Sequence, residues 1–274
     1  MSSSDVVLYD LQDGIATITW NRPEANNGWT TELELLYYQY LQNAEADPAV
    51  KVIVLTGAGR SFCPGADMNG LNNAASGRGS VGRSEPGAEA GRTPWPVDYP
   101  ATINKPTIAA INGACAGVGL VQACMLDFRF AVEGAKFTVA FARRGLIAEY
   151  GSAWLLPKIV GHANTLDLLM SSRVVLADEA QKMGLVNRVV AKEHLMDAVY
   201  EYAADIARNC SPTSMAIMKR QVEQAYLMDR LAATTEAHRL MNLTLRQTDF
   251  VEGVKSFVEK RQPTFGSIRT ELLP

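Results

Sequence analysis

Residues 107–120 have the sequence Thr-Ile-Ala-Ala-Ile-Asn-Gly-Ala-Cys-Ala-Gly-Val-Gly-Leu, in which an apolar run passes through a glycine-rich turn into a second apolar run. The first run is typical of a strand covered on both faces, and residues 120–126 are apolar enough for a buried helix. A similar order occurs earlier, where the β-branched run Val52–Gly57 leads into a glycine-rich loop that ends at Asp67. The repetition of this unit predicts an α/β fold.

The residues before Val52 predict a β-hairpin and one helix. Alternating segments at 6–11 and 15–20 flank an Asp13-Gly14 step, which suits a tight hairpin turn. A capping box at Thr31-Glu-Leu-Glu34 precedes apolar residues at helical spacing, and Asp47-Pro48 ends the pattern. Shorter strands are expected at residues 128–132, 136–138 and 186–190.

The pattern divides the chain into two regions. Residues 1–195 alternate strands and helices, whereas residues 196–274 are almost wholly helical and carry more apolar positions than a small helical piece can bury on itself. The second region therefore predicts a surface between subunits. Residues 72–100 are rich in Gly, Ser and Pro, and the strand and helix pattern resumes directly after them. We interpret them as an insertion that loops out of one domain rather than as a linker between two.

Composition limits the function classes. The 274 residues are 47% hydrophobic and 20% charged, as in a globular protein, and a net charge of -3 gives no reason to expect nucleic acid or an anionic membrane as a partner. No apolar run approaches the roughly 20 residues that span a bilayer, and the N-terminus resembles neither a signal nor a transit peptide, so we expect a cytoplasmic protein.

No metal site is expected, because neither the cysteines nor the histidines have ligand spacing. The cysteines are better explained as buried, reduced thiols; they are Cys63, Cys115, Cys124 and Cys210, and the histidines are His162, His194 and His238.

The turn at Gly117-Val118-Gly119 is a candidate binding site for a negatively charged group. It lies between the expected strand and helix, so its amides should lie at a helix N-terminus, which favours an anion or an oxyanion. The turn is not a phosphate-binding loop, since no Gly-Lys-Ser/Thr follows, and it lacks the full dinucleotide-binding spacing. Taken alone, these glycines are explained equally well by close helix packing.

Both glycine-rich turns together carry a family resemblance. The segment Ser61-Phe-Cys-Pro-Gly-Ala-Asp-Met68, followed later by residues 105–119, resembles the paired signature of the crotonase (enoyl-CoA hydratase/isomerase) superfamily. Further matches lie in order at residues 127–131, 177–190 and 252–265. The resemblance implies a spiral of ββα units followed by helices that assemble trimers or dimers of trimers. It also implies an acyl-coenzyme A thioester as the substrate in fatty acid metabolism, with no separate cofactor because coenzyme A enters as part of the substrate.

The resemblance assigns roles to individual residues. Family members hold the thioester oxygen between two backbone N–H groups, which correspond here to Ala66 and Val118. Such donors stabilise the charge of an enolate or tetrahedral species. Three residues beside these amides are placed with them at the substrate, namely Gly65, Asp67 and Gly117, although Asp67 can equally cap a helix. The resemblance also implies that Phe257 and Lys260 contact coenzyme A, on a neighbouring subunit; a core aromatic and a solvated lysine are the alternative.

The two glutamates of the family's hydratases are missing. Val121 and Phe141 occupy their positions, and neither can exchange a proton, so they are expected to shape an apolar acyl pocket. Glu149 is the candidate for the catalytic group, since dienoyl-CoA isomerases and an aromatic acyl-CoA dehalogenase of the superfamily are similar in placing an acid near this position. Its apolar flank at residues 146–148 would raise a carboxyl pKa. Alternatively, Glu149 complements the N-terminus of a helix expected around residues 152–160.

A lone carboxylate can remove a proton from a thioester and return it elsewhere, which is sufficient to isomerise an enoyl-CoA. The sequence therefore predicts an enzyme of the enoyl-CoA hydratase/isomerase type, a lyase or an isomerase. Thioester hydrolysis and carbon–carbon cleavage are also compatible with these residues. A non-catalytic acyl-CoA-binding homologue and an interaction protein that uses only its subunit surface are the rival hypotheses.

Overall fold

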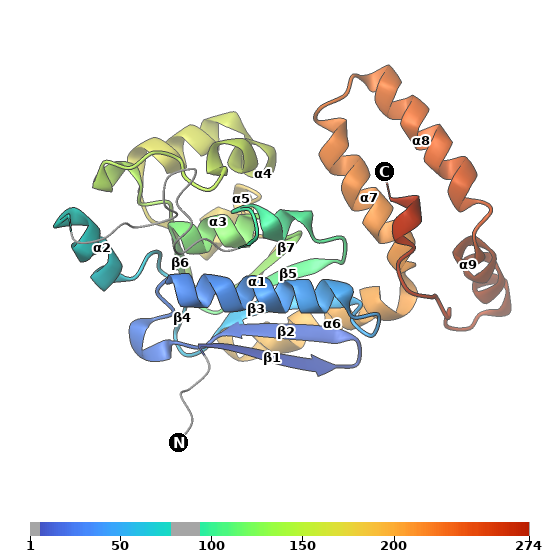
Figure 1. The fold of residues 1–274 in the computed structure, drawn as a ribbon, viewed down its shortest axis with the longest axis horizontal. Coiled ribbons are helices and arrows are strands. Elements are labelled where there is room, and N and C mark those ends of the chain that lie inside the picture. Colours follow the sequence, from blue (N-terminus) through green and yellow to red (C-terminus); the bar gives the residue numbers. More distant parts are fainter. Residues whose placement is uncertain (1–5, 78–93, 274) are drawn as a thin grey trace.

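The computed structural model describes residues 6–77 and 94–273, and a six-stranded sheet forms its centre (Figure 1). The strand order is β1-β2-β3-β5-β7-β10, in which β1 is antiparallel to β2 and the other neighbouring pairs are parallel. The strands are β1 (Val7–Gln12), β2 (Ile15–Trp20), β3 (Val52–Gly57), β5 (Thr107–Ile111), β7 (Phe128–Val132) and β10 (Arg188–Val190). The expected hairpin and the buried parallel strands are confirmed.

A second sheet of four short strands has the order β4-β6-β8-β9. Its strands are β4 (Ser61–Cys63), β6 (Ala114–Ala116), β8 (Lys136–Thr138) and β9 (Val175–Leu176). Each of the long strands β3, β5 and β7 is followed by a short strand of this second sheet and then by a helix. These helices are α2 (Met68–Ala75), α3 (Val118–Cys124) and α4 (Ser152–Leu166). The repeated order is the ββα spiral that the sequence predicted.

Two helix starts differ from the sequence prediction. Helix α1 (Thr31–Ala46) is capped by Thr30, whose extended backbone lets its hydroxyl accept from Leu33 N–H at 3.2 Å. The capping box at Thr31 was therefore placed one residue too late. Helix α3 begins at Val118 rather than at residue 120, because the chain turns at Gly117 with φ of +51°. This earlier start puts the Val118 amide in the first turn of the helix.

The long C-terminal helices are arranged in two groups. Helix α6 (Leu195–Asn209) packs on the large sheet against β2, β3, β5 and β7, with Val199 and Ala203 fully buried. Helices α7 (Pro212–Ala225), α8 (Arg230–Thr244) and α9 (Thr248–Glu259) extend from one side as an arm, at the right of Figure 1. A short helix, α5 (Ala177–Lys182), precedes β10. The division of the chain at residue 195 stays a prediction.

The expected insertion at residues 72–100 is described at its two ends only, since residues 78–93 lie outside the described part. Helix α2 (Met68–Ala75) starts before the insertion and runs into its beginning, and a 3₁₀ turn at Tyr99–Thr102 spans its end. Trp95 and Tyr99 pack against Tyr38 of α1, with ring centroids 6.3 and 5.8 Å from the Tyr38 ring. The C-terminal end of the insertion is thereby attached to the core. In the described ranges, no helix has both the length and the apolar character needed to cross a bilayer.

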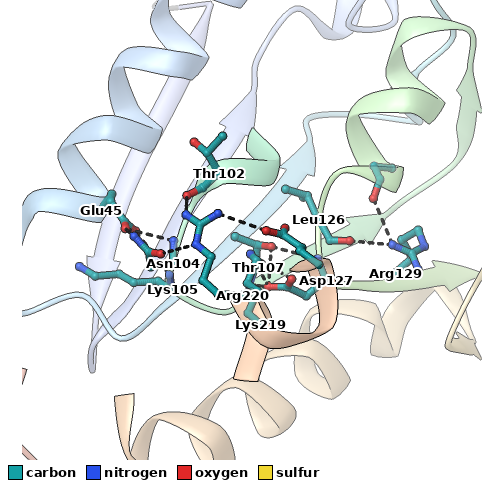
Figure 2. Close-up of polar contacts among 12 residues, drawn as sticks. Glu45, Thr102, Asn104, Lys105, Thr107, Leu126, Asp127, Arg129, Lys219 and Arg220 are labelled. Atoms are coloured by element: carbon teal, nitrogen blue, oxygen red, sulfur yellow. Dashed lines mark hydrogen bonds and ion pairs between the residues drawn. The ribbon is translucent and has the colours of Figure 1, made fainter. Parts of the chain in front are cut away.

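A polar cluster attaches helix α7 to the core (Figure 2). Lys219 of α7 places its Nζ 2.9 Å from Asp127 Oδ1, and the same carboxylate accepts from the backbone N–H and hydroxyl of Thr107 at 2.8 and 2.9 Å. The next residue, Arg220, donates to Asn104 Oδ1 at 2.9 Å. The cluster joins α7 to the starts of β5 and β7, so it fixes where the arm leaves the core.

Lys105 lies beside this cluster and closes the C-terminal end of α1. Its Nζ donates to the carbonyls of Ala44 and Asp47 at 2.6 Å each, and the side chain is buried. Burial lowers the pKa of Lys105 from its ordinary value. A cation at this position satisfies carbonyls that have no partner within the helix.

We expect Lys219→Met to lower the free energy of unfolding by about 2 to 3 kcal/mol, somewhat less than for a fully buried pair. The Lys219 and Asp127 side chains are 12% and 23% exposed, so the substitution leaves the carboxylate poorly compensated. Urea unfolding measures the change. The matched control is Lys255→Met, whose side chain is 61% exposed in an ion pair with Glu259, and which is expected to cost less than about 1 kcal/mol. Equal losses in both variants would contradict the role of Lys219.

Candidate active site

The two glycine-rich turns meet because the strands before them are neighbours. Strand β4 pairs with β6 in parallel, with Cys63 opposite Cys115, so the carboxyl ends of both strands lie side by side. The turns that follow contain Gly65 and Gly117. A methyl group added at Gly117 would lie 3.5 Å from Gly65 Cα, an ordinary van der Waals distance, so the two turns lie close together. The structure therefore brings together the turns that carry the predicted amides.

The Gly65–Ala66 peptide group is held by its carbonyl. Gly65 O accepts from Trp29 N–H at 2.9 Å and from the Cys63 thiol at 3.6 Å. In a trans peptide the N–H points away from the carbonyl, so the Ala66 N–H faces away from these donors. Among residues 6–77 and 94–273, no acceptor for the Ala66 N–H is found. The amide is thus oriented and left open.

The Gly117–Val118 peptide group has the same arrangement. Gly117 O accepts from Val121 N–H at 3.1 Å, which is the first hydrogen bond of α3. The Gly117 N–H donates to Thr138 O of β8 at 3.0 Å. The Val118 N–H has no acceptor within the described residues, and it lies at the positive end of the α3 dipole. Two open amides, both fixed through carbonyl hydrogen bonds, are what an oxyanion requires.

Helix α3 is fixed at both ends. A methyl group at Gly119 would lie 2.6 Å from Cys63 Cβ, so only glycine lets the helix start approach β4 this closely. At the other end, Arg129 donates to Leu126 O at 2.7 Å and is 6% exposed. Its positive charge complements the negative end of the helix dipole. The Val118 amide therefore belongs to a rigid element.

Three of the four cysteines are buried as expected, whereas Cys210 is exposed. Burial raises the pKa of Cys63 to about 12 and that of Cys124 to about 11. Burial also raises the pKa of Cys115. Because a neutral thiol keeps its proton, Cys63 can serve as a donor to Gly65 O rather than as a nucleophile.

Val121 and Phe141 are both buried, at 2% and 5% exposure, and belong to the hydrophobic core. Val121 lies in the first turns of α3, and Phe141 follows β8, whose neighbour in the sheet is β6. Both positions are therefore connected to the elements that carry the open amides. Neither side chain can transfer a proton.

Glu149 lies in the loop before α4 and is half-buried. Burial raises the pKa of its carboxyl from the ordinary value of 4.5. The raised pKa agrees in direction with the sequence prediction, but the apolar flank is not a sufficient reason for it, because Leu146 and Ile147 are 40% and 80% exposed. In the described part of the chain, the Glu149 carboxylate has no hydrogen bond or ion pair. Helix α4 has Gly151 at its N-cap and no side-chain cap, so the Glu149 carboxylate makes no capping hydrogen bond, and a purely electrostatic effect on the helix N-terminus stays a prediction.

The remaining predicted residues lie apart from one another. The Asp67 carboxylate is 3.2 Å from Arg22 Nη2, and α2 starts at the next residue. Phe257 is 85% exposed on α9, and Lys260 ends that helix with φ of +53°. In Figure 1, α9 and α2 lie at opposite ends of the long axis. A single chain therefore does not bring Phe257 and Lys260 to the turns, and their contact with coenzyme A across subunits stays a prediction.

Sequence reasoning missed the segment at residues 22–29, which forms hydrogen bonds with the turn around Ala66. Trp29 N–H and carbonyl bind Gly65 and Asp67 on either side of Ala66, and Arg22 contacts Asp67. The available signal was weak: a charged residue directly after an apolar strand, followed by the turn-forming run Asn26-Asn27-Gly28. The sequence reasoning also missed a cavity of about 620 Å³ between α7 and α9, which is lined mainly by apolar residues such as Met215 and Phe250.

Comparisons with known proteins show which proteins the chain resembles. The family model described as enoyl-CoA hydratase/isomerase matches residues 10–268. The 1,2-epoxyphenylacetyl-CoA isomerase of Escherichia coli K12 is 32% identical over 270 residues, covering 95% of this chain and 98% of the relative. A structure of a probable enoyl-CoA hydratase/isomerase from Mycobacterium abscessus has a TM-score of 0.84 at 28% identity, covering 95% of this chain and 98% of its own. The enoyl-CoA hydratase EchA12_1 of Mycobacterium marinum is 46% identical with a TM-score of 0.68, covering 82% of this chain and all of its own.

We expect Gly117→Ala to lower the free energy of unfolding by up to about 3 kcal/mol, because φ of +51° with ψ of -128° is a conformation that residues with a side chain rarely adopt. The added methyl group itself has room, since its nearest neighbour, Gly65 Cα, lies 3.5 Å away, so the loss comes from the backbone conformation. The matched control is Gly134→Ala, where φ is +71° but no atom lies within 4 Å of the added methyl group. That change is expected to cost about 1 kcal/mol. Urea unfolding that gives equal losses would show that the turn at Gly117 is not strained.

Proposed function

The chain belongs to the enoyl-CoA hydratase/isomerase family of enzymes, and we propose that it polarises the carbonyl of an acyl-coenzyme A thioester between the backbone amides of Ala66 and Val118. The family assignment confirms the resemblance found in the sequence and the crotonase-like fold that it implied. The amide roles, the acid/base group and the substrate are our proposals.

One observation carries the proposal: two neighbouring peptide groups, each anchored through its carbonyl and each with an open N–H. An unpaired N–H in a largely buried place is costly, so it is retained where a ligand supplies the acceptor. A thioester oxygen is such an acceptor, and it gains negative charge when an enolate forms. Loss of one donor from an oxyanion hole costs roughly 3 to 4 kcal/mol of transition-state stabilisation elsewhere.

We propose Glu149 as the acid/base group. Its carboxylate would take a proton from the α- or γ-carbon of the thioester, the electron pair would be held as the enolate, and the proton would return to the other carbon. The double bond then migrates without any other reactant. The open carboxylate and its raised pKa support this role. The name of the Escherichia coli relative supports isomerisation, whereas other relatives are named hydratases.

The side chains at Val121 and Phe141 support isomerisation over hydration by two carboxylates, since both positions are apolar and buried. In this proposal they shape the acyl pocket, and Gly65, Asp67 and Gly117 form the wall around the thioester. Coenzyme A arrives with the substrate, and the proton transfer described needs no separate cofactor. We retain the cytoplasmic location as a prediction.

The arm supports assembly into a homotrimer or a dimer of trimers. Large apolar side chains of α7, α8 and α9 are strongly exposed in the single chain; they include Met218, Val222, Leu231, Val251, Phe257 and Val258. A surface of this kind is expected to be covered by another subunit. Assembly would also give Phe257 and Lys260 access to the site of a neighbour.

We expect Glu149→Gln to lower kcat by about 10²- to 10⁴-fold on whichever enoyl-, dienoyl- or β-oxoacyl-CoA the wild type turns over. Gln retains the shape of Glu but cannot take a proton. Since burial raises the Glu149 pKa, the wild-type rate should fall as the pH drops through a value above 4.5, where the base becomes protonated. Steady-state kinetics across pH checks both statements.

The matched control is Glu133→Gln, an exposed residue in the turn between β7 and β8, which should leave the rate unchanged. Thioester binding without any turnover by the wild type would favour the non-catalytic alternative. Hydrolysis or chain cleavage of the same esters would identify the lyase or hydrolase alternative. Failure to bind any coenzyme A ester would contradict the proposed function.

We expect sedimentation to give a mass of three or six times the 29.8 kDa of one chain. Val251→Asp, at a side chain that is 62% exposed on α9, should lower that mass by placing a charge in the covered surface. Val174→Asp, at a 50% exposed residue outside the arm, is the matched control and should not change the mass. A wild-type protein that is monomeric at every concentration would contradict the assembly.

A further inference from the structure

The loop between β2 and α1 forms backbone hydrogen bonds with the residues on both sides of Ala66. Trp29 N–H donates to Gly65 O at 2.9 Å, and Asp67 N–H donates to Trp29 O at 3.0 Å. This bridge includes the residues immediately before and after Ala66, so it fixes the segment that carries the open amide. Trp29 is itself anchored, because its ring packs edge-on against Trp20 at a centroid distance of 5.4 Å.

A single guanidinium joins the two sides of this bridge. Arg22 Nη1 donates to Gly28 O at 2.6 Å, and Arg22 Nη2 donates to Asp67 Oδ2 at 3.2 Å. The Arg22 and Asp67 side chains are only 19% and 14% exposed. Arg22 therefore connects the residue before Trp29 to the residue after Ala66. A planar guanidinium suits this place, since its donors have a fixed relative geometry.

Asn27 fixes the base of the same loop. Its fully buried side chain donates to Ala58 O at 2.9 Å and to Ser61 O at 2.8 Å, and it accepts from Arg22 N–H at 2.8 Å. A methyl group at Gly57 would lie 2.7 Å from Asn27 Nδ2, so β3 ends in glycine where the amide passes. Asn27 thus connects the backbone of Arg22 to the turn between β3 and β4. The position from which the Arg22 side chain extends is therefore fixed.

We propose that Arg22 is a positioning residue for the oxyanion hole, which sets the direction of the Ala66 N–H by holding Gly28 O and the Asp67 carboxylate together. The inference rests on the proposed function, since it concerns how one of the two amides is aimed. In this scheme the Asp67 carboxylate also acts through Arg22 on the backbone, in addition to its place in the wall around the thioester. Without the guanidinium, the hydrogen bonds from Arg22 to Gly28 O and to the Asp67 carboxylate are lost. The Ala66 peptide can then rotate, which changes the direction of its N–H.

The test uses full-length Arg22→Met and the infrared carbonyl band of bound 2,4-hexadienoyl-CoA labelled with ¹³C at C1. In the wild type, the band should lie at lower wavenumber than in free thioester. In Arg22→Met, we expect more than about half of this displacement to be lost, and kcat to fall by about 10- to 100-fold with KM changed less. Thermal unfolding verifies that the variant is folded. If Arg22→Met does not fold, Arg22→Lys, which keeps a cation, is tested in the same way.

The matched control is Arg60→Met, because Arg60 also ties this loop, through Asn26 Oδ1 at 2.8 Å, but is exposed and does not contact Asp67. It should leave the band and the rate unchanged. A normal band and rate in a folded Arg22 variant would overturn the inference, as would a raised KM with a normal band, which indicates direct contact with coenzyme A. A wild-type protein that binds no thioester would instead overturn the proposed function, and this inference with it.

Discussion

The close approach of the Gly65 and Gly117 backbones is the constraint on which the rest of the site depends. It exists because β4 and β6 are parallel neighbours whose carboxyl ends coincide. The φ angles of +114° at Gly65 and +51° at Gly117 are conformations that residues with a side chain rarely adopt. Gly119 extends the same close approach to the first turn of α3, where it lies against Cys63. Three glycines thus allow a strand end and a helix start to share one small volume.

Backbone donors need anchors, because a peptide group that can rotate does not stabilise charge at a fixed point. Both peptides of this site are anchored at the carbonyl, one by Trp29 and Cys63 and the other by the first hydrogen bond of α3. The anchors come from elements that have other reasons to be rigid. Trp29 packs in an aromatic cluster, and α3 is held at its far end by buried Arg129.

In the proposed function, the apolar side chains of Val121 and Phe141 take the places of the glutamates that hydratases of this family use, and they shape the acyl pocket. Glu149 is then the candidate for proton transfer. Its open carboxylate and raised pKa fit that task. The arm formed by α7, α8 and α9 holds Phe257 and Lys260 far from this chain's own turns. The proposed contact of these two residues with coenzyme A therefore depends on the proposed assembly.

Features that depend on residues close together in the chain could be predicted from the sequence. The Asp13-Gly14 turn, the buried strands β3 and β5 and the helical C-terminal region were predicted correctly because hydrophobic periodicity and turn chemistry are local. The ordered motifs also identified the family. The boundaries at Thr30 and Val118 were misplaced by one or two residues, since the start of each helix is set by backbone conformation as well as by residue type.

Contacts between groups far apart in the chain became visible in the folded structure alone. Arg22 contacts Asp67 across 45 residues, and Lys219 contacts Asp127 across 92 residues. Neither pair leaves a local pattern, because each depends on the order of strands in the sheets and on where a helix crosses them. The same reason applies to the open amides. The sequence indicated which residues carry them, but the parallel pairing of β4 with β6 brought them together, and their carbonyl hydrogen bonds set their direction.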